Sequence, residues 1–582
     1  TPARLTLSAV LLDAATGAER ATAAVTGSAD SLAALVDALA VRLVARRAMG
    51  EERAGTFVGA TLPVLRAYLR AEAAYRADRY QEAMTLYEQA LARDSSFAPA
   101  ALGLAAAADR RNAAEPHDRA LALAWAARDR LGARDRAYLL ALAGPRWPAP
   151  SPADEQIDAW EQAVALAPER AEAWSELGER FFHDGALLGI RAPAARARAA
   201  FERAVALDPT DPSAARFLVE LAVRTGDAGT IRQVATPARL RAAGPDLTEY
   251  LTWRVAVATG DSATLARLRS RMPGFPTPAL RAIAMAAQHD AVGLADGARA
   301  LRLLGGRAAL AGEQLDVLLA EHALALLQGR PVLALDVTER LQDAQPGSRA
   351  HLRLRILDAL HAEGDREAAE AAALELATRA AGPPATPRER ATWLADACVL
   401  AQWRVAPWGP AARGPSRGDL ALARRELAAL RTDAVPAVPV PVGASPQACA
   451  ELVEAMLAVT TGARDARARV DRLDALMLTG PALGDASAWA TLAVARLYEQ
   501  LGDPRRALHA VRQRPYLKGW PRYQATALRE QARLAAALGD TVGAAAAWRP
   551  YLALRTAPEP PLRDAVTAER AWARPLLDAA RP

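Results

Sequence analysis

Two periodicities of apolar residues divide the chain. Near the amino end, apolar and polar residues alternate along Arg4–Asp13, a turn ends at Gly17, and a second β-compatible run covers Ala18–Gly27. The apolar positions of the first run that share a face are Leu5, Leu7, Ala9 and Leu11. Residues Ser28–Arg47 have helical spacing instead. The pattern predicts a β-hairpin followed by an amphipathic helix.

A hairpin and one helix make a small domain, because an isolated hairpin is barely stable in water. We therefore expect residues 1–50 to be the tail of a larger α/β domain. The segment resembles the end of the TolB-like amino-terminal domain, in which a Leu-Asp-Ala-x-Thr-Gly turn precedes such a helix. The matching residues are Leu12, Asp13, Ala14, Thr16 and Gly17.

From about Ala67 onward the spacing of apolar residues is helical and is interrupted by turns. Ala171–Pro209 is the clearest segment, with an insert at Gly185–Pro193. Its large and small residues are Trp174, Leu177, Gly178, Phe181, Ala197, Phe201, Ala204 and Pro209. This order resembles the tetratricopeptide repeat (TPR), a helix–turn–helix of 34 residues. Small residues at the glycine and alanine positions let the two helices approach closely, and proline ends the second helix.

Other segments have the same pattern. The first repeat has Ala71, Tyr75, Tyr80, Ala83, Tyr87 and Ala90, a second has Trp160, Ala163 and Pro168, and one near the end has Gly539, Ala544, Trp548 and Tyr551. Gly-Asp pairs close several first helices, at Gly226, Gly260, Gly364, Gly502 and Gly539. Glycine can take the left-handed conformation that ends a helix, and aspartate can cap the next helix.

The predicted fold class is therefore all-α, a TPR-like right-handed superhelical solenoid of helix hairpins with a small amino-terminal β-hairpin-plus-helix remnant. We expect repeats over residues 51–432, a proline-rich connector over 433–446, and further repeats with a capping helix over 447–582. The predicted capping helix is Arg563–Ala580, which alternates charge with Val566, Trp572 and Leu576.

Charge and cysteine content change this picture little. The net charge is +6, and the arginines mostly alternate with acidic residues at helical spacing, which indicates solvated helix faces rather than a nucleic-acid footprint. Lys518 is the single lysine, and this usage is typical of a high-GC bacterial genome. Cys398 and Cys449 lack metal-ligand spacing, so we expect them to be small helix-packing residues. No apolar run is long enough to span a membrane, and we expect a cytoplasmic location.

Catalytic motifs are missing from the sequence. Lys518 has no glycine loop before it, which excludes a P-loop, and the lysine and His-Arg-Asp motifs of a protein kinase are absent. Ser416 stands in a Gly-x-Ser-x-Gly string, but a proline-containing loop precedes it where a hydrolase has a strand. The seven histidines are scattered. We predict no enzyme activity, no metal and no cofactor.

The resemblance implies a protein-protein interaction scaffold that binds a peptide or protein partner in a groove lined by first helices. The alternative is a regulatory segment of a bacterial serine/threonine kinase or transcriptional regulator whose catalytic or DNA-binding domain lies upstream. The family pattern places these residues in the groove: Tyr68, Glu72, Tyr75, Arg76, Glu172, Glu176, Glu179, Phe182, His183, Arg216, Glu220 and Arg224. Their mixed charge favours a partner segment that carries both an acidic and a basic residue.

Overall fold

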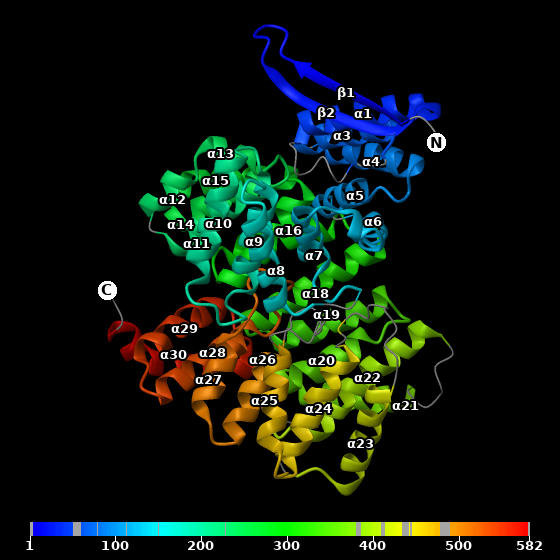
Figure 1. The fold of residues 1–582 in the computed structure, drawn as a ribbon. Coiled ribbons are helices and arrows are strands. Elements are labelled where there is room, and N and C mark those ends of the chain that lie inside the picture. Colours follow the sequence, from blue (N-terminus) through cyan, green and yellow to red (C-terminus); the bar gives the residue numbers. More distant parts are fainter. Residues whose placement is uncertain are drawn as a thin grey trace. The chain divides into compact units, whose positions relative to one another are not determined.

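The computed structural model describes residues 4–49, 57, 60–77, 79–111, 113–148, 151–226, 228–379, 386–408, 414–432, 442, 445–477 and 489–579. The chain forms two compact units. The first contains Thr1–Ser151 and Glu155–Ala173, and the second contains Pro152–Asp154 and Trp174–Pro582. Figure 1 gives the labels of the helices and strands used below.

The first unit begins with the predicted hairpin and helix. Strands β1 (Arg4–Leu12) and β2 (Glu19–Ser28) pair antiparallel, and α1 (Leu32–Met49) packs on them. The predicted inner face of β1 is half-buried at its first three positions, but Leu11 is 42% exposed, because the sheet has two strands and its far end is uncovered. In the turn, Asp13 accepts hydrogen bonds from Arg20 and from the backbone of Thr16, which lower the pKa of its carboxyl group to about 2.

Helix pairs make up the rest of the first unit. They are α3 (Leu62–Arg76) with α4 (Tyr80–Arg93), α5 (Ala98–Arg110) with α6 (Ala114–Ala126), and α7 (Ala133–Ala143) with α8 (Ala153–Leu166). Gly103 on α5 lies against the ring of Tyr87 on α4, where a Cβ atom would come within 2.4 Å of the ring. Glycine is required there because the helices approach more closely than any side chain at that position would permit.

The second unit continues the series of pairs. Its helices are α9 (Ala171–Asp184, which begins in the first unit), α10 (Pro193–Leu207), α11 (Pro212–Thr225), α12 (Ala228–Val234), α13 (Pro237–Ala242), α14 (Thr248–Thr259), α15 (Ser262–Arg271), α16 (Thr277–Asp290), α17 (Leu294–Gly305), α18 (Ala311–Gln328), α19 (Pro331–Ala344), α20 (Ala350–His361), α21 (Arg366–Arg379), α22 (Pro387–Val405), α23 (Arg417–Thr432), α24 (Pro446–Thr460), α25 (Ala466–Met477), α26 (Ala490–Gln500), α27 (Pro504–Arg512), α28 (Gln524–Ala537), α29 (Thr541–Leu554) and α30 (Pro560–Ala579). The first helices of the pairs are α9, α11, α14, α16, α18, α20, α22, α24, α26 and α28. With one two-stranded sheet among the described residues, the predicted all-α fold of TPR-like helix pairs with an amino-terminal hairpin is confirmed.

Hydrogen bonds between neighbouring first helices show the repeat length directly. Arg254 donates to Glu220 at 3.0 Å and Arg533 donates to Glu499 at 2.6 Å, each across 34 positions. Two other such pairs, 34 and 35 positions apart, are Glu179–Ser213 and Arg281–Asp316, and Asp471–Arg506 joins two second helices across 35 positions. Residues one repeat apart therefore lie side by side on adjacent helices, as in a TPR array.

The best-matched repeat has the predicted close approach. A Cβ atom at Gly178 would lie 2.7 Å from the ring of Phe201 on the paired helix, and Ala197 is fully buried. The Gly-Asp turns differ among themselves. Gly260, Gly502 and Gly539 are left-handed, with φ of 69°, 75° and 79°, whereas Gly226 is extended at the end of α11. The aspartates after the left-handed glycines cap the next helices, namely Asp261, Asp503 and Asp540, and the predicted partner of Gly226, Asp227, lies outside the described residues.

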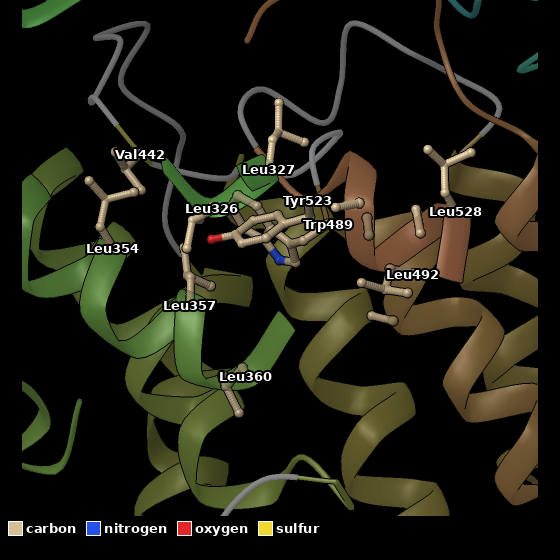
Figure 2. Close-up of a cluster of buried hydrophobic side chains, with 14 of the residues drawn as sticks. Leu326, Leu327, Leu354, Leu357, Leu360, Val442, Trp489, Leu492, Tyr523 and Leu528 are labelled. Atoms are coloured by element: carbon tan, nitrogen blue, oxygen red, sulfur yellow. The ribbon is translucent and has the colours of Figure 1, made fainter. Parts of the chain in front are cut away.

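The last repeats of the second unit pack against its middle repeats, a closure that the sequence pattern did not predict. Helices α26 and α28 lie beside α18 and α20 (Figure 1). Figure 2 shows Trp489 and Tyr523 between leucines of α18 and α20 on one side and Leu492 and Leu528 on the other. Arg555, after α29, donates to the carbonyl oxygen of Leu326 at 2.7 Å. One hydrophobic core therefore runs from α11 to α30.

Helix α30 lies at the predicted position of the capping helix and packs on α29. The ring of Trp572 meets that of Trp548 at 5.5 Å between centroids, and Val566 is buried. Trp572 is nevertheless 52% exposed. The helix thus covers the apolar face of the last pair while its own outer face stays accessible to water.

The expectation for the cysteines was wrong. Cys398 on α22 and Cys449 on α24 are fully buried and form a disulfide, with their Cα atoms 5.7 Å apart. Their separation of 51 positions gave no sign of this, because a helical hairpin and the next first helix return the chain to the same place. The bond joins helices on both sides of the predicted connector 433–446, most of which lies outside the described residues, and both sides belong to the second unit.

Candidate functional site

A long connection between α27 and α28 crosses the first helices of the second unit. This segment, Gln513–Tyr523, has no regular secondary structure, and we call it the strap. It contacts side chains of α9, α11, α14, α16, α18 and α20, which we call the first-helix face. Short turns join most other helices, such as the three residues between α28 and α29. Long loops inside compact domains commonly carry function.

Tyr516 is the centre of the strap. Its hydroxyl group donates to the carboxylate of Asp290, 3.0 Å away, and its ring lies edge-on to Phe182, 5.2 Å away. The guanidinium group of Arg224 lies 3.7 Å from the centroid of the same ring, a cation–π contact. Burial, and then the negative charge of Asp290, raise the pKa of the Tyr516 hydroxyl group.

The backbone of Tyr516 pairs with one histidine at the end of α9. Its N–H donates to the carbonyl oxygen of His183 at 2.9 Å, and Nδ1 of His183 lies 2.7 Å from the Tyr516 carbonyl oxygen. Burial lowers the pKa of His183 to about 3, so the ring is neutral at neutral pH. Because a carbonyl oxygen only accepts, Nδ1 carries the proton. The strap is therefore held by its backbone as well as by its side chains.

The side chains of the strap donate, and aspartates of the first helices accept. Besides the Tyr516–Asp290 bond there are three such bonds: Lys518 Nζ to Asp184 at 2.5 Å, Trp520 Nε1 to Asp316 at 2.9 Å, and Tyr523 Oη to Asp358 at 2.9 Å. The four aspartates come from α9, α16, α18 and α20. Each of these four helices supplies one acidic acceptor, so the face matches an irregular segment rich in side-chain donors.

Buried ion pairs between neighbouring first helices lie next to the strap contacts on this face. Arg254 on α14 donates to Glu220 at 3.0 Å and lies 2.5 Å from Asp290. Tyr250 also donates to Glu220. Arg254 and Glu220 are almost completely buried, so their charges compensate each other away from water. Arg254 also reaches the Tyr516 hydroxyl group at 3.4 Å, which connects the pair to the strap.

The predicted insert after α9 lies at the start of the strap. Gly189 is left-handed, with φ of 64°, and a Cβ atom there would lie 3.7 Å from Nε2 of Gln513. Asp184, which binds Lys518, directly precedes the insert. The insert and the strap, which both depart from the regular repeat pattern, therefore lie next to each other.

Four predicted site residues of the second unit contact the strap or the groups that hold it. Phe182, His183 and Arg224 contact Tyr516 directly. Glu220 is fully buried against Arg254 and Tyr250, so the prediction that it faces a partner is corrected. Its burial follows from its position between two first helices, where a carboxylate needs a cationic partner.

The other predicted residues of this unit are Glu176, Glu179 and Arg216. Glu176 is buried and lies 3.6 Å from Arg180, Glu179 accepts a hydrogen bond from Ser213, and the guanidinium group of Arg216 lies over the ring of Phe217. Glu179 thus contacts the next first helix, whereas Glu176 and Arg216 each contact a residue of their own helix.

The predicted residues of the first unit are engaged within that unit. Tyr68 is a core residue, only 2% exposed, because its ring packs with those of Phe57, Tyr87 and Phe97. The prediction placed Tyr68 on the groove, and its depth in the helix pair corrects this. The remaining residues are Glu72, which accepts from Tyr87 at 2.7 Å, Tyr75, whose ring meets Tyr80, Arg76, which is exposed, and Glu172, which pairs with Arg170 at 3.2 Å.

The sequence reasoning missed the strap and its aspartates. The residues missed were Asp184, Asp290, Asp316, Asp358, Tyr516, Trp520 and Tyr523. One signal was present: the single lysine stands in Arg514–Trp520, between two aromatic residues, in a chain with only 5% aromatic residues. The aspartates had no signal, because the chain has 66 acidic residues and nothing in their spacing distinguishes these four.

Among the described residues, no group of three or more His, Cys, Asp or Glu side chains could hold a metal ion. Ser416 has a structural role: its hydroxyl group accepts from the N–H of Asp419, and Asp419 accepts from the N–H of Ser416, at the start of α23. This reciprocal pair is a helix cap. None of the described helices is long and apolar enough to cross a membrane.

No family model matches the chain. No curated protein matches it in sequence. Among solved structures, the chain is similar to PilW, a type IV pilus biogenesis factor, at 18% identity and a TM-score of 0.27, covering 37% of this chain and 94% of PilW. It is also similar to the Cut9–Hcn1 hetero-tetramer of the APC/C, at 12% identity and a TM-score of 0.25, covering 89% and 96%, and to the TPR domain of P58(IPK), at 10% and 0.19, covering 89% and 99%. At these scores the likeness carries no weight, and the fold assignment rests on the helix pairs and their 34-residue spacing.

Proposed function

We propose that the chain is a non-catalytic scaffold that binds a peptide or protein partner on the first-helix face of its second unit. One observation carries the proposal: a segment without regular secondary structure, the strap, already lies on this face and is held there by side chains from six first helices. A face that holds one such segment through acceptors on several helices is suited to hold another of similar chemistry.

The charges of this face favour a protein partner over a nucleic acid. The acceptors that contact the strap are aspartates from four helices. Four carboxylates along one path repel a phosphate backbone, whereas nucleic-acid sites are lined with cations. Contrary to the expectation of a mixed-charge partner, the face therefore favours a partner segment rich in N–H and O–H donors.

Cross-linking mass spectrometry with partners captured from the native source tests the proposal. The test variant carries Asp184→Asn, Asp290→Asn and Asp316→Asn, which preserve side-chain shape and remove charge. The matched control carries Asp158→Asn, Asp246→Asn and Asp336→Asn, at exposed positions away from the strap contacts. We expect cross-links to residues of the first-helix face, and at least tenfold lower recovery with the test variant only. Equal recovery with both variants, or cross-links confined to other surfaces, would refute the proposal.

The alternative function, a regulatory segment of a kinase or transcriptional regulator, has one observation in its favour. Val10, Leu12 and Val36 of the amino-terminal hairpin and helix are each more than half exposed. Further strands of a TolB-like domain would cover such residues. The coding sequence upstream of this segment tests the alternative. A kinase or DNA-binding domain encoded there would support it, and the lack of such a domain would count against it.

The cytoplasmic location stays a prediction, and the disulfide Cys398–Cys449 bears on it, because cytosolic proteins rarely keep disulfides. Protein isolated from its native source and denatured in an alkylating reagent provides the test. Two free thiols would favour the cytoplasm, and none would favour an oxidising compartment.

A further inference from the structure

The strap has the features of a bound ligand that belongs to the same chain. We propose that Arg514–Trp520 occupies the site of the partner. The partner is a segment that can adopt the bent course of the strap and has the same donors: an aromatic residue, a lysine two positions later and a second aromatic residue two positions after that. The partner displaces this part of the strap when it binds. The inference rests on the proposed function and adds the chemistry of the partner and the state of the unbound protein.

The donor–acceptor pattern determines the chemistry of the partner. Tyr516, Lys518 and Trp520 alternate along the strap and each donates to one aspartate, on α16, α9 and α18 respectively. The chain bends between these residues, because Leu517 and Gly519 are both left-handed, with φ of 52° and 63°, and each of the three side chains reaches the aspartate of a different first helix. An acidic residue at any of these positions would face a carboxylate, so an acidic segment is excluded by repulsion.

The exposure of the strap differs between its centre and its ends. Gln513, Arg522 and Tyr523 are buried, and Tyr523 lies in the core between the middle and last repeats (Figure 2). Lys518 and Gly519 are exposed. The centre can therefore leave the face while both ends stay anchored, and the helices on either side need not move.

The backbone of the centre is held in a disfavoured conformation. Leu517 has φ of 52°, in the left-handed region that residues with a branched side chain rarely adopt. Such conformations persist only where surrounding contacts impose them. Release of the strap lets Leu517 return to an ordinary conformation, which assists exchange.

A cavity next to Tyr516 gives the partner a first point of contact. Its volume is about 590 Å³, and its lining includes the apolar Val223, Ile231 and Val257 together with Arg224, Arg254 and Asp290. Arg254 and Asp290 are the groups that hold the Tyr516 hydroxyl group. An apolar side chain that neighbours the partner's aromatic residue fits here while the strap is still in place.

A labelled peptide with the sequence of residues 514–520, RPYLKGW, tests the inference by fluorescence anisotropy. The released protein carries Tyr516→Ala, Lys518→Ala and Trp520→Ala in the full chain. A second released protein replaces residues 514–520 by a Gly-Ser linker of equal length, which keeps the Tyr523 anchor and guards against misfolding of the first. We expect the peptide to bind both released proteins at least tenfold more tightly than the wild type.

Two controls define the site. A peptide with phenylalanine, methionine and phenylalanine in place of the tyrosine, lysine and tryptophan should bind at least tenfold more weakly, and Asp290→Asn in the released protein should weaken the parent peptide. Equal affinity for wild type and released proteins, or no difference between the two peptides, would overturn the inference. Sedimentation experiments on the released protein test for binding of a second copy. If the released protein dimerises and the peptide RPYLKGW dissociates the dimer, the face binds a second copy, and the inference is overturned.

Failure here is distinguishable from failure of the proposed function. If RPYLKGW does not bind but the aspartate variants lose captured partners, the face binds partners of other chemistry and only the strap inference fails. If neither effect is seen, the scaffold proposal fails as well.

Discussion

The two units use the same residue types on or directly before their first helices, with different results. In the first unit, Arg170 pairs with Asp135 at 3.0 Å and lies over the ring of Tyr138, 35 positions or fewer away. In the second unit, Arg254 pairs with Glu220 across one repeat and also reaches Tyr516, 262 positions away. Ion pairs between neighbouring repeats thus occur in both units. Holding a distant segment is a property of the second unit's face alone among the residues described.

The largest expected effect comes from two buried tryptophans, one in each unit. Trp489→Ala and Trp160→Ala should each lower the free energy of unfolding by about 3–5 kcal/mol, because both side chains are at most 2% exposed. Only Trp489 packs in the cluster that anchors Tyr523 (Figure 2). Hydrogen-exchange mass spectrometry should therefore show faster exchange of the strap in Trp489→Ala and not in Trp160→Ala. Equal strap exchange in the two variants would remove the distinction between the units.

Replacing Arg254 in the second unit and Arg170 in the first unit should lower the free energy of unfolding by different amounts. Arg254→Met leaves Glu220 buried without its charge partner and should cost about 3–5 kcal/mol. Arg170→Met should cost somewhat less, because Arg170 and its partner Asp135 are 17% and 6% exposed, against 2% and 0% for Arg254 and Glu220, so water can replace part of the lost contact. Chemical denaturation of both variants measures this. A larger loss for Arg170→Met would contradict the comparison.

The close helix approaches should behave alike in both units. Gly178→Ala and Gly103→Ala place a Cβ atom against Phe201 and Tyr87, and each should cost about 1–3 kcal/mol by overpacking. Denaturation curves and strap exchange are the readouts. Similar losses of unfolding free energy, with no change in hydrogen exchange of the strap, would confirm that the two units share this helix packing. Unchanged stability of both variants would contradict the assigned repeat register.

Acid should weaken the unit that holds the strap. Burial, with Lys518, Arg216 and Arg180 nearby, lowers the pKa of His183 to about 3 from an ordinary value of 6.5. Between pH 6.5 and pH 3 this histidine is protonated in the unfolded chain and neutral in the folded chain. The free energy of unfolding therefore has its full contribution from His183 above pH 6.5 and falls as the pH is lowered below 6.5, by at most about 1.4 kcal/mol per pH unit. His183→Asn retains an N–H donor near the Nδ1 position and does not titrate, so it should flatten the stability curve between pH 6.5 and 5. An unchanged slope in His183→Asn would contradict this.

The smallest effect concerns exposed arginines over aromatic rings. Arg224 lies over Tyr516 in the second unit and Arg128 over Trp125 in the first, and replacing either by alanine should change stability by about 0.5–1 kcal/mol. Arg224→Ala should also increase hydrogen exchange at Tyr516, and Arg128→Ala should not. Equal exchange in both would indicate that the cation–π contact does not hold the strap.

The sequence by itself determined the local structure. Alternation predicted the hairpin, and the spacing of small and large residues predicted the helix pairs, the approach of Gly178 to the paired helix and the caps at Asp261, Asp503 and Asp540. These features depend on residues within about one repeat of each other, so a pattern of that length is sufficient. That the first helices bind a partner stays a prediction, and three of the residues predicted there contact the strap directly.

Only the tertiary structure decided what lies on that side. The bond between Cys398 and Cys449, the burial of Tyr68 and Glu220, and the pairing of Tyr516 with His183 depend on where distant segments meet. A repeat sequence specifies contacts between neighbours, while the return of the last repeats to the middle follows from small rotations accumulated over many pairs. The position of the strap is set by that accumulated geometry, which no single stretch of the sequence encodes.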